Sequence, residues 1–129
     1  MPLTLDQATA LEHVGDTLYI GFNDDLERIC FPKLQTIGGA LIIEHNGALK
    51  EIVLPSLVRL TKYLHIHSNA GLTVVELPKL RDVGGAFSLL DNPNLHTVKV
   101  SVASAPVKVS ALEVNGCGKP IYPSMHVRA

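Results

Sequence analysis

The chain has 129 residues, of which 47% are hydrophobic and 18% charged, a composition typical of a single globular domain. Its net charge of −1 argues against a general binder of nucleic acid or of anionic membranes. No run approaches the roughly 18 apolar residues of a membrane-spanning helix, so membrane insertion is not expected. The chain has no Trp and only six aromatic residues, which excludes a core of large rings, and its apolar residues are mainly Leu, Val, Ile and Ala.

The N-terminal residues 1–14 are predicted to form a cap. Thr4 and Gln7 resemble a helix capping box, which favours a short helix over residues 5–14 that covers the open end of the structure. Residues 1–4 lack the basic and apolar regions of a secretory signal. Two cysteines, Cys30 and Cys117, are too few for a disulfide framework. These features favour a cytoplasmic protein over a fragment of a surface protein.

An asparagine recurs every 23 residues along most of the chain, and the apolar residues around it fall into seven columns. The asparagines are Asn23, Asn46, Asn69, Asn92 and Asn115. The column three residues before them contains Ile20, Ile43, Ile66, Leu89 and Leu112. A fixed period of this length indicates a solenoid, in which each turn buries its apolar side against its neighbours. We predict one domain of about five turns, regular over residues 15–100, with an irregular last turn and tail over residues 101–129.

Each turn is predicted to contain short strands and no helix. The apolar pair before each asparagine has a period of two, as in a strand with both residues facing inward. An inward asparagine must be hydrogen-bonded, and its amide can bond the backbone from one turn to the next. Gly38 with Gly39, and Gly84 with Gly85, are expected at a sharp corner. The fold class predicted is therefore a parallel β-solenoid.

Two segments carry a family resemblance. They are Leu34-x-x-Ile37-Gly38-Gly39-x-Leu41-x-Ile43-x-x-Asn46 and Leu80-x-x-Val83-Gly84-Gly85-x-Phe87-x-Leu89-x-x-Asn92-x-x-Leu95. They resemble the leucine-rich-repeat-like receptor L domain, over roughly residues 11–100. The resemblance implies a right-handed β-helix of short parallel strands with one sheet face that binds partners. It transfers no individual ligand-binding residue to this chain.

The outward positions of the strands before the asparagines are unusually apolar. The candidate binding residues on this face are Tyr19, Ile42, Glu44, Tyr63, His65, His67 and Leu90. Exposed apolar patches with aromatic rings often mark interaction sites. The sequence favours a non-enzymatic module that binds another protein or a second copy through this face. Coverage by the chain's own C-terminal tail, and a structural repeat segment of a larger surface protein, are the alternatives.

His65 and His67 lie on one strand face near Glu44, which also makes a metal-binding protein an alternative. No set of Ser, His and Asp and no carboxylate pair indicates catalysis, and no cofactor is expected. Opposite charges are predicted to meet across neighbouring turns as ordinary solvated pairs. These pairs are Glu27–Lys50, Arg28–Glu51, Arg59–Asp82 and Glu76–Lys99.

Overall fold

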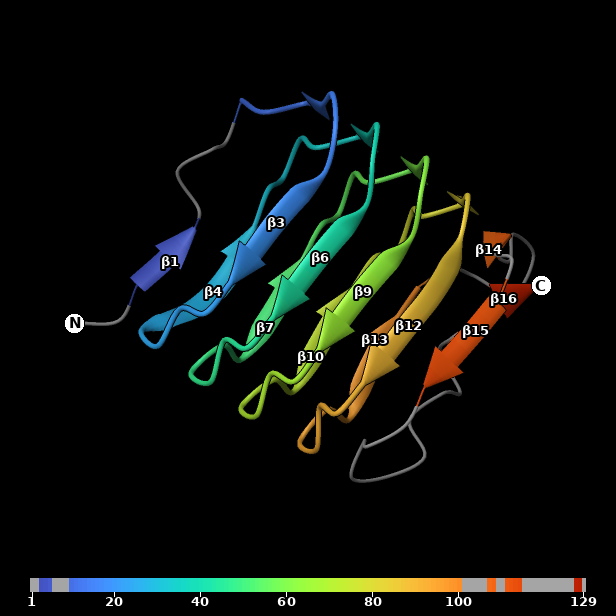
Figure 1. Cartoon of the computed structure of the whole chain (residues 1–129). Helices are drawn as coiled ribbons and strands as arrows, with labels where there is room; N and C mark the ends of the chain where they lie inside the picture. Colours follow the sequence, from blue (N-terminus) through green and yellow to red (C-terminus); the bar gives the residue numbers. More distant parts are fainter. Residues whose placement is uncertain (1–2, 6–9, 101–106, 109–110, 115–126, 129) are drawn as a thin grey trace.

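The chain winds into a stack of short parallel strands that runs from one end of the molecule to the other (Figure 1). The computed structural model describes residues 3–5, 10–100, 107–108, 111–114 and 127–128. All regular elements in these residues are strands. No helix long and apolar enough to cross a membrane occurs in the described part of the chain.

The strands form three sheets. Sheet A contains β1 (Leu3–Leu5), β4 (Leu26–Cys30), β7 (Glu51–Val53), β10 (Val74–Glu76) and β13 (Thr97–Lys99). Sheet B contains β2 (His13–Val14), β5 (Thr36–Ile37), β8 (Arg59–Leu60), β11 (Asp82–Val83), β14 (Val107–Lys108) and β16 (Val127–Arg128). Sheet C contains β3 (Leu18–Gly21), β6 (Leu41–Glu44), β9 (Leu64–His67), β12 (Ala86–Leu90) and β15 (Ala111–Val114).

Each turn contributes one strand to sheet B, then one to sheet C, then one to sheet A. Neighbouring strands within a sheet are parallel, and from β2 to β13 they lie 23 residues apart, so that Leu18 faces Leu41 and Leu41 faces Leu64. The predicted parallel β-solenoid is therefore confirmed. The described strands from β2 to β13 complete about four turns, so the expected number of five was too high.

The helix expected over residues 5–14 is wrong where the structure describes this segment. Leu3–Leu5 is strand β1 and pairs with β4, and His13–Val14 is strand β2 and pairs with β5. Residues 6–9, including Gln7, lie outside the described residues. The edge of β4 has unpaired backbone groups that form hydrogen bonds with β1. This pairing is more favourable than the helical turn that the two capping residues suggested.

The 23-residue register ends before the last turn. Leu112 of β15 lies opposite Phe87, and Val114 lies opposite Leu89, so the expected column of Leu89 with Leu112 is wrong. The offset is two residues. A shift by an even number keeps every side chain on its original face, whereas an odd shift would turn the apolar residues outward. Asn115 lies outside the described residues.

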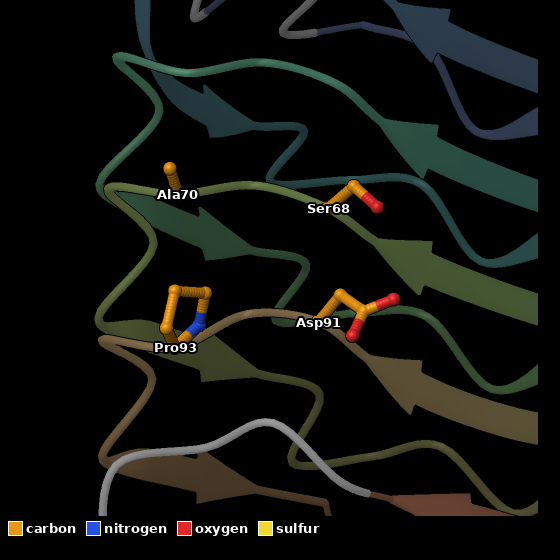
Figure 2. Close-up of a pocket in the computed structure, with 4 residues that line it drawn as sticks. All are labelled: Ser68, Ala70, Asp91 and Pro93. Atoms are coloured by element: carbon orange, nitrogen blue, oxygen red, sulfur yellow. The ribbon is translucent and has the colours of Figure 1, made fainter.

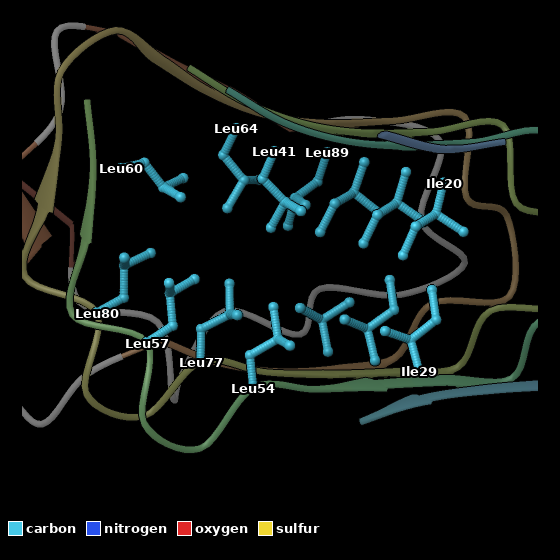
Figure 3. Close-up of a cluster of buried hydrophobic side chains, with 14 of the residues drawn as sticks. Ile20, Ile29, Leu41, Leu54, Leu57, Leu60, Leu64, Leu77, Leu80 and Leu89 are labelled. Carbon is cyan, nitrogen blue, oxygen red and sulfur yellow. The ribbon is translucent and has the colours of Figure 1, made fainter. Parts of the chain in front are cut away.

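The predicted apolar columns form one continuous core between the sheets (Figure 3). Leucines and isoleucines from opposite walls meet there, and most are almost completely buried. Leu11 and Val14 pack against this core as the end of an incomplete turn. Because every turn places side chains of similar size in the same column, Leu, Ile and Val fill most of the core, and Phe31 and Phe87 are its aromatic members.

The corner between sheets B and C presses each turn against the one before it. Gly38 N donates to Val14 O at 2.7 Å, and Gly84 N donates to Leu60 O at 3.0 Å. A Cβ atom on Gly84 would overlap the carbonyl oxygen of Thr61. A Cβ atom on Gly38 would likewise overlap the carbonyl oxygen of Gly15, so close backbone approach requires glycine at positions 38 and 84. Thr61, which occupies the same corner in the third turn, keeps the equivalent bond to Ile37 O at 3.1 Å.

The buried asparagines form a ladder along the axis of the stack. The Oδ1 atom of Asn46 accepts hydrogen bonds from the backbone N and the Nδ2 of Asn23, at 3.1 and 3.0 Å. Asn46 Nδ2 donates to Asn69 Oδ1 and to Ile20 O. Both donor hydrogens and the carbonyl oxygen of this buried amide are thus satisfied. Asn69 repeats the arrangement with Asn92, so the predicted ladder is confirmed for the asparagines that the structure describes.

Candidate functional site

The seven candidate residues all lie on the outer side of sheet C, which we call the sheet C face. Tyr19, Ile42 and His65 are neighbours in one row, and Glu44, His67 and Leu90 form a second. The residues between them on each strand, such as Ile20 and Ile43, are buried. The alternation of strand side chains therefore turns both rows outward. Tyr63, just before β9, completes the set.

Two phenol rings are the most exposed of these seven residues. Tyr19 has 48% and Tyr63 has 41% of its surface exposed. Ile42, Glu44, His65, His67 and Leu90 are half-buried. The face therefore presents rings and aliphatic groups held by a backbone that is bonded on both sides at β6, β9 and β12.

Tyr19 lies along its own strand and reaches the next turn. Its hydroxyl donates to Glu44 Oε2 at 2.8 Å. The ring passes over Gly21, where a Cβ would come within 2.5 Å of the Tyr19 hydroxyl oxygen, so the absence of a side chain at position 21 makes room for it. The hydrogen bond to Glu44 raises the pKa of Tyr19, and desolvation and the nearby negative charge of Glu44 act in the same direction.

The polar contacts continue from Glu44 across the next two turns. His65 Nε2 lies 3.3 Å from Glu44 Oε1. The ring centroids of His65 and His67 are 3.3 Å apart, and His67 Nε2 lies 2.6 Å from Ser88 Oγ. Tyr19, Glu44, His65, His67 and Ser88, which we call the polar chain, thus link β3, β6, β9 and β12 through side chains alone. Each of these side chains is held by the next one, which fixes the shape of the face.

The contact between the tilted rings of His65 and His67 does not by itself make a metal site. Their ring planes are tilted by 32° to each other. The described residues contain no group of three or more His, Cys, Asp or Glu side chains placed to hold a metal ion. The geometry brings Glu44 to His65, and not to the directly opposite His67 as the register alone suggested.

The sequence did not select Ser88, Gly21 or Phe22 as site residues. Ser88 is a strand residue only 6% exposed, and its role appears only once His67 is seen beside it. Phe22 is 67% exposed and stacks on His45, with ring centroids 4.7 Å apart. The 23-residue spacing of Phe22 and His45 could have revealed this pair.

The residues before the ladder asparagines share an unusual backbone. Phe22, His45, Ser68 and Asp91 have φ angles of 55° to 57°, in the left-handed region. This conformation is costly for a bulky side chain such as that of Phe22. It recurs because each strand of sheet C must end in a turn that directs the following asparagine inward. The stack of Phe22 on His45 is therefore presented by a fixed turn.

A second surface feature is an open pocket at these turns. It is lined by Ser68, Ala70, Asp91 and Pro93, from the turns that follow β9 and β12 (Figure 2). The pocket combines one hydroxyl and one carboxylate with two apolar side chains. None of its lining residues belongs to the sheet C face.

The predicted charge pairs lie away from this face. Lys50 Nζ is 3.7 Å from Glu27 Oε1, and Lys99 Nζ is 3.6 Å from Glu76 Oε1. Arg28 also bonds Glu51. Arg59 and Asp82 lie opposite each other in β8 and β11. Exposed pairs of this kind contribute little to stability, and they support the register of sheets A and B.

Comparison with protein-family models, with curated proteins and with solved structures found no match for this chain.

Proposed function

We propose that this protein is a non-enzymatic binding module that presents the sheet C face to a partner protein. The observation that carries the proposal is the pair of exposed rings, Tyr19 and Tyr63, on an outer sheet face with Ile42 and Leu90. Tyr provides large contact area with few rotatable bonds, and it is enriched in protein interfaces. Because the polar chain already orders several side chains, little conformational freedom remains to be lost on binding.

The resemblance to the receptor L domain adds to this proposal. We propose that the chain is a short relative of that family, on the basis of the repeated segments that end in Asn46 and Asn92. The parallel solenoid is the architecture that the resemblance implies, and a sheet face is the surface that it implies for binding. That the partner is a protein is inferred from the residues of this chain alone.

Site-specific photo-crosslinking tests the proposal. Tyr63→benzoylphenylalanine places the probe on the sheet C face, and Lys99→benzoylphenylalanine places the same probe on sheet A as a matched control. In the protein's own cells we expect one discrete adduct from position 63 and none from position 99. The adduct should disappear when Tyr19→Ala and Ile42→Ala are added. Equal crosslinking from both positions, or an adduct indifferent to these substitutions, would contradict the proposal.

Self-association is the second candidate, and the edge of sheet C favours it. β3 is the first strand of that sheet, so one side of its backbone has no neighbouring strand among the described residues. Such an edge can accept a strand from another chain. Sedimentation of the purified chain over a wide concentration range tests this, since a mass that rises with concentration would support self-association.

Metal binding by His65 and His67 is the remaining alternative, and only their proximity supports it. A zinc titration followed by NMR separates it from the binding module. Saturable shifts of both imidazoles at micromolar zinc would favour a metal protein.

A further inference from the structure

We propose that the partner of the sheet C face carries an arginine side chain, which docks on Glu44 within an otherwise apolar contact. This inference rests on the proposed function and names the chemistry of the partner. It follows from the state of the Glu44 carboxylate, from the charges around it and from the rings beside it.

The Glu44 carboxylate is held in place by two side chains and still has unused positions for accepting hydrogen bonds. Its Oε2 receives the Tyr19 hydroxyl at 2.8 Å, and its Oε1 lies 3.3 Å from His65 Nε2. An ionised carboxylate can accept about four hydrogen bonds, two on each oxygen. Within the described residues these side-chain contacts use one position on each oxygen, so one position on each is left. Two parallel N–H groups of a guanidinium match this pattern, in the bidentate pairing typical of arginine.

The charge of the face is complementary to such a group. Among the outward residues of β3, β6, β9 and β12, Glu44 is the only acidic residue and none is Lys or Arg. Its neighbour His65 carries a charge only when protonated, so a carboxylate with no Lys or Arg on its own face disfavours an acidic partner and favours a cationic one. In sheet A, by contrast, Glu27 and Glu76 each have a lysine partner from the chain itself.

Aromatic groups stand on both sides of Glu44. Tyr19 lies on the preceding turn, and His65 with Tyr63 lies on the following one. A guanidinium is planar and weakly hydrated, so it stacks on aromatic faces while it donates hydrogen bonds in its own plane. A lysine ammonium can satisfy the charge but not the two parallel bonds. Ile42, beside Glu44 on β6, offers the contact for an apolar residue next to the arginine.

NMR titration with three short peptides tests the inference. The probes are acetyl-Leu-Arg-Leu-amide, the same peptide with Lys in the centre, and the same peptide with citrulline. Citrulline keeps the shape of arginine but lacks its charge. We expect the arginine peptide to shift the signals of Tyr19, Glu44 and His65 in a saturable way. The lysine and citrulline peptides should bind at least about tenfold more weakly.

Two matched variants complete the experiment. Glu44→Gln should weaken binding of the arginine peptide at least about tenfold, because the charged acceptor is lost. Glu76→Gln makes the same change on sheet A and should leave binding unchanged. Equal affinity for the three peptides, or full binding by Glu44→Gln, would overturn the arginine assignment. If no peptide binds while the crosslink from position 63 still forms, the arginine chemistry is wrong and the binding module stands. If the chain instead pairs with itself through this face, the occupant is a second copy and the inference fails.

Discussion

At the scale of single residues, the contact between Tyr19 and Glu44 has a measurable electrostatic signature. The hydrogen bond stabilises the neutral phenol, and the carboxylate charge repels a phenolate, so Tyr19 releases its proton at a higher pH than an ordinary tyrosine. The stabilisation from this contact is complete below the tyrosine pKa of the unfolded chain. It is lost as the pH rises through the higher value of the folded state.

Glu44→Gln is therefore expected to lower the pKa of Tyr19 towards its ordinary value. The amide removes the negative charge and is a weaker acceptor for the hydroxyl. The measurement is the titration of the Tyr19 ring carbon signal by NMR. Glu76→Gln is the control, and an unchanged Tyr19 titration in Glu44→Gln would show that the contact does not persist in solution.

Gly21→Ala tests how the ring of Tyr19 is placed. The new methyl group occupies space now filled by the ring, so the ring must swing away from Glu44. We expect the Tyr19 pKa to fall in this variant too, while the fold is kept because position 21 lies at the strand end. The same titration measures it. Gly47→Ala is the matched control, since a Cβ there meets nothing within 4 Å.

The asparagine ladder makes a different prediction, about stability. Asn69→Leu removes the acceptor of two donors from Asn46 and one donor to Ile43 O in a fully buried site. Leaving buried polar groups unpaired is expected to cost about 1–3 kcal/mol of unfolding free energy. Chemical denaturation measures the change. Asn94→Leu, at an exposed position, should cost much less, and equal stability of the two variants would contradict the role of the ladder.

At the scale of elements, the corners between sheets B and C set how closely the turns can stack. Gly84→Ala forces a methyl group into the Thr61 carbonyl and should destabilise the protein by about 1–3 kcal/mol, the usual cost of overpacking. Thermal or chemical unfolding measures it, and Gly47→Ala again serves as the comparison. A loss of stability in Gly47→Ala as large as that in Gly84→Ala would mean that backbone approach is not the cause.

The sequence predicted the strands correctly where the apolar positions recur every 23 residues. It did not predict them where this repeat is lost. The rows of Leu18 with Leu41 and of Ile20 with Ile43 could be aligned because each residue has the same surroundings in each turn. The strand at Leu3–Leu5 could not be foreseen, since its stability comes from β4, which lies more than twenty residues away in the chain. The two-residue offset of β15 could not be foreseen either, because the apolar columns are not kept in the segment between β13 and β15.

The candidate face could be predicted only as a set of positions. Strand alternation was enough to place Tyr19, Glu44 and His65 on one surface. The strand register could not predict which atoms make contact, because the long side chain of Glu44 can reach either His65 or His67. The side-chain rotamers decide between these two contacts, and a periodic sequence pattern does not encode rotamers.

At the scale of the whole molecule, each turn contacts only the turns before and after it. Stability is then a sum of terms between nearest neighbours, and the outermost turns open first. We expect backbone amides of β6 and β9 to exchange with solvent most slowly and those of β2 and β3 to exchange faster. Hydrogen exchange measured by NMR or mass spectrometry tests this. Uniform protection from β2 to β13 would indicate instead that the stack opens as a single unit.

The orientation of the asparagine amides gives the stack a polarity. The bonds between asparagines all run in one direction, because Asn23, Asn46 and Asn69 each donate from Nδ2 to the Oδ1 of the next asparagine towards the C-terminus. The other Nδ2 hydrogen of Asn46 and of Asn69 donates back to a backbone carbonyl of the preceding turn. The two ends of the ladder therefore differ in kind, with acceptors at one end and donors at the other. If two copies met through identical ends, their ladders would run in opposite directions. If they met through different ends, the ladder of one copy could continue into the other. End-to-end association that continued this ladder would therefore join unlike ends, the heterologous geometry that gives rings or open filaments.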